Sequence, residues 1–252
     1  MNMLHKHLNL PKSCFINTRI PKKAFINNPE FDLKSKEKEI LQKYVNSIYL
    51  QYSLKPDVLN IPSYEDEEVR YEEIQIIKIK LNEQNKEEKI CDIIQKYIPY
   101  PIIIVINFSS FIKFNISIKK INKVKTERLV IEKMIYTDWI NLNGLSLKER
   151  DFLESLDISK MLSINLFKTY EGFVNIINSF ITSKYRESFK IQSQETNLKD
   201  IKLLEKIEIL QNEVTTLRNK LRQESNIGNR VELNVQIKKI EKNIVMIKSN
   251  LS

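Results

Sequence analysis

Six carboxylates gather in one short stretch of the chain and are the first candidates for chemistry. They are Glu65, Asp66, Glu67, Glu68, Glu72 and Glu73, with Arg70 as the only cation between residues 63 and 75. Carboxylates that share a site can hold Mg²⁺ for phosphodiester cleavage. A restriction-type nuclease would also need a carboxylate and a lysine one residue apart on a strand, and Glu132-Lys133, the nearest pair, lacks that spacing. The stretch leaves two interpretations open, a metal-dependent nuclease site and a solvated acidic loop.

Other reaction types are limited by the counts of histidine, cysteine and glycine. His5 and His7 are the only histidines, so a metal site lacks a third ligand and a Ser-His or Cys-His nucleophile pair is excluded elsewhere. Cys14 and Cys91 are too few for a disulfide scaffold or a zinc site. The 3 glycines lie far apart, so no glycine-rich phosphate loop can form. We assign no catalytic residue, metal or cofactor, and we favour a protein that is not an enzyme.

The formal net charge is +9, and the cations are concentrated in two places. Residues 1–36 and residues 109–128 each carry a net charge of +5. Basic side chains can contact phosphates without exact geometry, which suffices for non-specific binding to nucleic acid. The candidates for such contact are Lys12, Arg19, Lys22, Lys23, Lys113, Lys119, Lys120, Lys123, Lys125 and Arg128. The alternative is that these side chains are ordinary solvated cations.

The elements that must position these residues form a mixed α/β domain over residues 35–190. Pro11, Pro21 and Pro29 exclude a long helix from residues 1–34, which we expect to form an extended basic arm. Apolar periodicity predicts helices over 35–54, 86–97, 146–157 and about 159–186, and strands over 72–81, 101–108, 111–121 and 128–136. We therefore predict an α+β fold whose sheet has about four strands, with flanking helices.

The last quarter of the chain has heptad spacing. Apolar residues follow one another at intervals of four and three in two runs, which are separated by residues 225–229. They are Leu203, Ile207, Leu210, Val214, Leu217 and Leu221, then Leu233, Ile237, Ile240, Ile244, Ile247 and Leu251. Such seams pair helices as coiled coils, and a short connection makes the two helices antiparallel neighbours. We predict an antiparallel coiled-coil hairpin over residues 195–252, with one long intermolecular coiled coil as the alternative.

The longest apolar run has the length of a strand. It covers residues 101–106, which is too short to span a membrane. The first residues contain no apolar segment of the kind found in signal peptides. We therefore expect a soluble, cytoplasmic protein without a membrane partner.

Five stretches resemble a bacterial family known as domain of unknown function 4391. They are residues 10–13 and 17–22, which together form the first motif, and residues 72–75, 98–102 and 229–234. The first and the last motifs are fairly specific, whereas the middle ones are mostly strand-like. The similarity extends over nearly the whole chain. The resemblance implies a bacterial protein encoded near helicase and DNA-methyltransferase genes of restriction or phage-defence type. It transfers no catalytic residue to this chain.

These observations lead us to expect a non-enzymatic accessory protein of a bacterial DNA-processing or phage-defence system. The hairpin would bind a larger protein, such as a helicase or a methyltransferase, and the basic arm would contact DNA. Two alternatives remain open. One is a metal-dependent nuclease that uses residues 65–73, and the other is a purely structural interaction protein.

Overall fold

The computed structural model describes residues 3–29, 33–123 and 129–251. The chain divides into two compact units, Met1–Ile177 and Asn178–Ser252. The boundary between them falls inside helix α7 (Leu166–Thr182).

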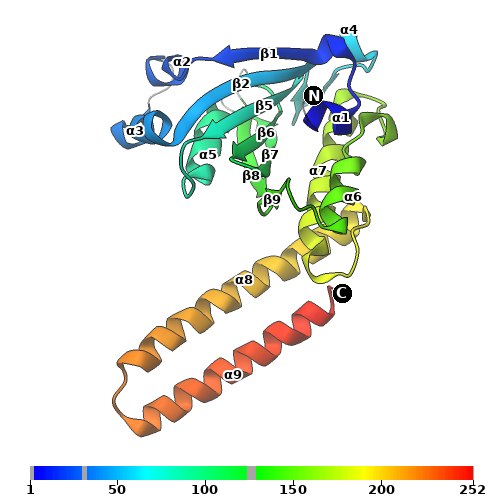
Figure 1. The fold of residues 1–252 in the computed structure, drawn as a ribbon. Coiled ribbons are helices and arrows are strands. Elements are labelled where there is room, and N and C mark those ends of the chain that lie inside the picture. Colours follow the sequence, from blue (N-terminus) through cyan, green and yellow to red (C-terminus); the bar gives the residue numbers. More distant parts are fainter. Residues whose placement is uncertain (1–2, 30–32, 124–128, 252) are drawn as a thin grey trace. The chain divides into compact units, whose positions relative to one another are not determined.

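A seven-stranded mixed sheet organises the described part of the first unit (Figure 1). Its order is β1-β2-β5-β6-β7-β8, and the short strand β9 also pairs with β7. The strands are β1 (Phe15–Ile20), β2 (Val45–Leu54), β5 (Ile74–Leu81), β6 (Ile102–Phe108), β7 (Phe111–Ile121), β8 (Leu129–Tyr136) and β9 (Ile140–Asn141). Strands β5 and β6 are parallel and are connected through helix α5 (Glu87–Tyr97), whereas the other neighbours are antiparallel. Two further short strands, β3 (Tyr64–Glu65) and β4 (Arg70–Tyr71), form a separate ribbon.

The prediction of about four strands is wrong, because it did not include β1, β2 and β9. Residues 35–54 show why β2 was missed. They were expected to form one helix, but helix α3 (Ser35–Tyr44) ends at Tyr44 and the chain continues as strand β2. The apolar spacing of Val45, Ile48 and Tyr52 fits a helix. Residues 45–54 are nevertheless rich in β-branched and aromatic side chains, which favour strands. Because β2 pairs with β1 on one side and with β5 on the other, sheet pairing decides its conformation.

The described part of residues 1–34, where an extended basic arm was predicted, contains two short helices and a strand of the sheet. Strand β1 is an edge strand of the sheet, because it pairs with β2. Around it lie helix α1 (Met3–Leu8), the 3-10 turn η1 (Lys12–Cys14) and helix α2 (Lys23–Ile26). Leu10 and Phe25 are buried, but Phe15 remains 40% exposed. The segment therefore belongs to the fold of the first unit.

Helices cover both faces of the sheet. Helices α3 and α5 pack on one face through a cluster that includes Leu41, Ile48 and Ile94. On the opposite face, helix α6 (Leu147–Ser155) places Phe152 edge-on against Phe114 of β7, with 5.5 Å between the ring centroids. These two buried layers form the core of the first unit.

The start of α6 on the second face is stabilised by a cap. Ser146 and Glu149 form a capping box, since each side chain accepts a hydrogen bond from the backbone N–H of the other residue. The helix predicted over residues 159–186 begins only at Leu166. Leu162 and Ile164 precede it and are exposed, so they do not cover the sheet.

Two long helices dominate the second unit. Helices α8 (Gln194–Gln223) and α9 (Ile227–Ser249) run antiparallel, side by side, and are joined by a short connection (Figure 1). The Ser193 hydroxyl and the Asn226 amide oxygen accept N–H groups of the first turn of α8 and α9, respectively. No helix in the described part of the chain is both long enough and apolar enough to cross a membrane.

Candidate interaction surfaces

The carboxylates of the acidic stretch are held by separate partners. Glu65 forms an ion pair with Arg70 at 2.7 Å. Asp66 accepts the backbone N–H groups of Val69 and Glu68, and these two hydrogen bonds are the main reason that the pKa of Asp66 is lowered. Both residues thus stabilise the β3–β4 ribbon.

Glu73 is the one buried carboxylate of this stretch, with 8% of its surface exposed. It accepts hydrogen bonds from Ser53 Oγ at 2.7 Å and Gln75 Nε2 at 2.9 Å, and Lys55 Nζ lies 3.7 Å from its second oxygen. Glu73 therefore links the ends of β2 and β5. Among the residues described, no group of three or more His, Cys, Asp and Glu side chains could hold a metal ion.

The two histidines lie on helix α1 and not on a strand. The ring of His5 stacks on that of Tyr52, with 6.2 Å between the centroids and 5° between the planes. Burial lowers the pKa of His7, and the neighbouring Lys6 lowers it further. His5 therefore packs against the sheet.

Lys119 was predicted to contact phosphates, but it is buried. Its side chain is 2% exposed, and its Nζ donates to the carbonyl oxygens of Ile98 at 2.9 Å and Tyr100 at 2.8 Å. Burial lowers its pKa to about 7. Asn115, Ser117 and Lys119 of β7 alternate onto the face that α5 covers, where Gln95 of α5 is hydrogen-bonded to Asn115 and Ser117. Lys119 is not available to a phosphate.

Other predicted contacts already have partners within the fold. Lys22 Nζ donates to the carbonyl oxygens of Gln42 and Val45, at the end of α3. Lys120 forms ion pairs with Glu68 at 3.3 Å and Glu132 at 3.2 Å. These two lysines are thus partly neutralised or already hydrogen-bonded.

The remaining predicted cations do not form one cluster on one element. Lys113 Nζ lies over the Tyr136 ring, 5.5 Å from its centroid, and near Trp139. The side chains of Lys12, Arg19 and Lys23 are exposed on η1, β1 and α2, and that of Lys123 is exposed two residues after the end of β7. Lys125 and Arg128 lie outside the described residues. Among the residues predicted to contact phosphates, Arg19 is the one that has further basic side chains near it on the same sheet.

A row of basic and aromatic residues crosses the sheet beside Arg19. Strand pairing places Arg19 opposite Tyr49, and Tyr49 opposite Lys78, while Lys80 follows two residues along β5. We call Arg19, Tyr49, Lys78 and Lys80 the basic sheet row. Sequence reasoning missed its last three members. The alternation of Lys78 and Lys80 in a predicted strand was the available signal, but only the strand register shows that they lie beside Arg19.

Eleven of the twelve residues predicted for the seam pack together in one cluster between α8 and α9. Ile207, Val214, Ile237, Ile244, Ile247 and Leu251 are buried together, and Leu203, Leu210, Leu217, Leu221 and Ile240 pack against them. The exception is Leu233, which lines an open groove near the connection. Arg218 and Glu241 add an ion pair between the helices at 2.6 Å.

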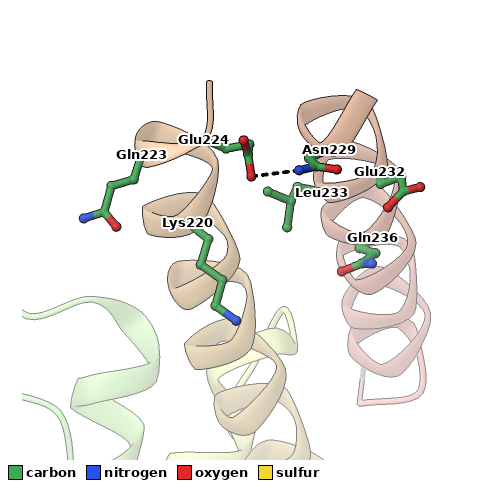
Figure 2. A pocket seen from close by; sticks show the side chains of 7 residues that line it. All are labelled: Lys220, Gln223, Glu224, Asn229, Glu232, Leu233 and Gln236. Atoms are coloured by element: carbon green, nitrogen blue, oxygen red, sulfur yellow. Dashed lines mark hydrogen bonds between the residues drawn. The ribbon is translucent and has the colours of Figure 1, made fainter. Parts of the chain in front are cut away.

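Figure 2 shows this groove at the tip of the helix pair. Its volume is about 430 Å³, and it is lined by Lys220, Gln223, Glu224, Asn229, Glu232, Leu233 and Gln236. Glu224 accepts the backbone N–H of Asn226 at 2.8 Å and the side-chain amide of Asn229 at 3.1 Å, and these bonds lower its pKa. The groove therefore has mostly polar walls, and Glu224 fixes the connection.

Apolar side chains also lie on the side of α9 that faces away from α8. Val231, Val235, Val245 and Met246 are 58%, 61%, 67% and 61% exposed. Their spacing places them opposite the seam, where Lys238, Lys239 and Lys242 separate them along the helix. We call these seven residues the outer face of α9.

The fold and these surfaces define a mixed α/β protein that carries a pair of long helices. The chain belongs to the family described as Domain of unknown function (DUF4391), whose family model matches residues 8–244. The resemblance found in the sequence is thereby confirmed. No match was found among curated proteins or among solved structures.

Proposed function

We propose that this chain is a non-enzymatic accessory protein of a bacterial DNA-processing or phage-defence system. In this proposal α8 and α9 form an antiparallel coiled coil that binds a larger protein, such as a helicase or a methyltransferase, and the basic side chains of the first unit contact nucleic acid. The observation that carries the proposal is the outer face of α9. Its apolar residues remain exposed although the seam between the helices is already filled.

Part of the apolar surface of α9 is not used in its pairing with α8. The seam buries the residues that hold α8 to α9, so the outer face contributes nothing to that pairing. Burying a Val or Met side chain stabilises an association by about 1.5–3 kcal/mol. Lysines between the apolar residues would suit a partner whose contact surface is apolar with acidic residues at its rim.

The sequence left two alternative functions open, a purely structural interaction protein and a metal-dependent nuclease. A purely structural interaction protein would use the same outer face and would lack the nucleic-acid contact. The prediction of a metal-dependent nuclease stays a prediction, and nothing among the described carboxylates favours it, because Glu65, Asp66 and Glu73 each have partners of their own.

Replacing Val231, Val235 and Val245 together by glutamine in the full chain tests the proposal. The three side chains are exposed, so we expect an unchanged circular dichroism spectrum and melting temperature. The partner, identified first by affinity capture from the native source, should bind the variant at least about tenfold more weakly in a titration.

The matched control is the pair Leu198→Gln and Ile209→Gln, which replaces exposed apolar residues on α8 instead of α9. This control should keep the affinity of the unmodified chain. A triple variant that binds the partner as tightly as the unmodified chain would rule out the outer face of α9 as the docking surface.

A further inference from the structure

The basic sheet row combines three cations and one aromatic ring on a single face of the sheet. Directly paired residues of neighbouring strands project to the same face, so Arg19, Tyr49 and Lys78 do so. Lys80 is on this face as well, since side chains two residues apart on a strand share a face. Neighbouring strands lie about 4.8 Å apart and residues rise about 3.3 Å, so the backbone positions of the three cations are about 7 to 12 Å apart.

Helices leave this end of the face uncovered. Further back along β5, Ile76 lies on the same face and is buried, with 1% of its surface exposed. Arg19 and Lys80 are exposed, and Tyr49 and Lys78 are half-buried. The row thus lies where the covered part of the sheet gives way to solvent.

The charge of the row is not compensated within the described residues. None of the ion pairs found there involves Arg19, Lys78 or Lys80, in contrast to Lys120. Burial lowers the pKa of Lys78, and the neighbouring Lys80 lowers it further. An anion bound between these two lysines would relieve their repulsion.

We propose that the basic sheet row binds single-stranded nucleic acid. Arg19, Lys78 and Lys80 contact successive phosphates, and the ring of Tyr49 stacks on an unpaired base between them. A paired base keeps its faces stacked inside the duplex, so the aromatic ring favours a single strand. This inference rests on the nucleic-acid contact in the proposed function and is independent of the outer face of α9.

The test measures fluorescence anisotropy of labelled oligonucleotides with the full chain at several salt concentrations. An oligothymidylate of about 20 nucleotides should bind, and the logarithm of its affinity should fall with the logarithm of salt with a slope of about −2, because three cations release about 0.7 counterion each. An oligouridylate of the same length distinguishes RNA from DNA as the preferred strand. A duplex of the same length should bind more weakly than the single strands.

Two variants separate the roles of the row. The double variant Lys78→Gln, Lys80→Gln should weaken binding and reduce the size of the slope by about 1.4. Tyr49→Leu should weaken binding about tenfold and leave the slope unchanged, because stacking releases no counterions. The control Lys36→Gln, Lys89→Gln removes two exposed lysines from α3 and α5, which cover the other face, and should bind like the unmodified chain.

Each contrary result has a distinct meaning. If the Lys78/Lys80 variant binds like the unmodified chain, the contact lies elsewhere and this inference fails while the proposed function stands. If no oligonucleotide binds, the inference and the proposed nucleic-acid contact fail together. Duplex binding as tight as single-strand binding, or equal displacement by polyglutamate, would overturn the assignment to single-stranded nucleic acid.

Discussion

Replacing Ile207 by aspartate is expected to separate helix α8 from helix α9. Ile207 is 2% exposed and belongs to the buried cluster that joins the two helices. Removing a buried isoleucine side chain costs about 2–5 kcal/mol, and a desolvated carboxylate adds a further cost. Because helices of this kind are stabilised mainly by packing, both should lose helical structure once the seam is broken.

The matched control for this experiment lies two residues further along the same helix. Ile209 is 66% exposed, so Ile209→Asp introduces the same charge into α8 without entering the seam. Circular dichroism at 222 nm should fall strongly for Ile207→Asp and remain unchanged for Ile209→Asp. Equal spectra and equal melting curves for the two variants would contradict the packing of α8 on α9.

The same pair of variants distinguishes a seam that closes within one molecule from a seam that forms between two molecules. If the seam closes within one molecule, light scattering should give a mass near 29.9 kDa for the unmodified chain. Since the outer face of α9 requires a folded helix, Ile207→Asp should also lose the partner protein, and Ile209→Asp should retain it. A dimer that Ile207→Asp converts to a monomer would instead favour the intermolecular alternative.

Local periodicity within each helix accounts for the side chains that pack together between α8 and α9. Spacing of three and four is a property of the helix itself, so the sequence predicts which side chains share a face. Leu233 has the same spacing but lies outside the buried cluster, because it lines the groove at the tip together with polar residues of both helices. That geometry involves two separate segments and is not encoded in spacing alone.

The conformation of a sheet segment cannot be predicted from local periodicity alone. Val45, Ile48 and Tyr52 fit a helical face, but pairing of β2 with strands that are distant in sequence makes this segment a strand. The sequence does not give the strand register. For this reason Lys119 was wrongly expected at the surface, and the position of Lys78 beside Tyr49 and Arg19 was missed. A strand sequence gives the alternation of its side chains, whereas only its neighbours determine which face is covered.

The stability of the protein is expected to depend on the protonation of Lys119. Its pKa is about 7 in the folded chain because of burial, whereas an unfolded lysine titrates near 10.4. Between these values the unfolded chain binds more protons than the folded one, so this lysine makes folding more favourable as pH rises. The slope reaches at most about 1.4 kcal/mol per pH unit and flattens below the folded pKa, where both states are protonated.

The variant Lys119→Met isolates this effect, because other groups act in the opposite direction. Burial raises the pKa of the Cys91 thiol, so an alkaline pH favours the unfolded chain at that residue. Urea denaturation from about pH 7 to about pH 9.5 should show the unmodified chain gaining stability relative to Lys119→Met. Lys120→Met, which removes the neighbouring exposed lysine, should keep the pH profile of the unmodified chain in this range. Parallel profiles for the unmodified chain and Lys119→Met would mean that the buried lysine stays protonated, held by the carbonyl groups of Ile98 and Tyr100.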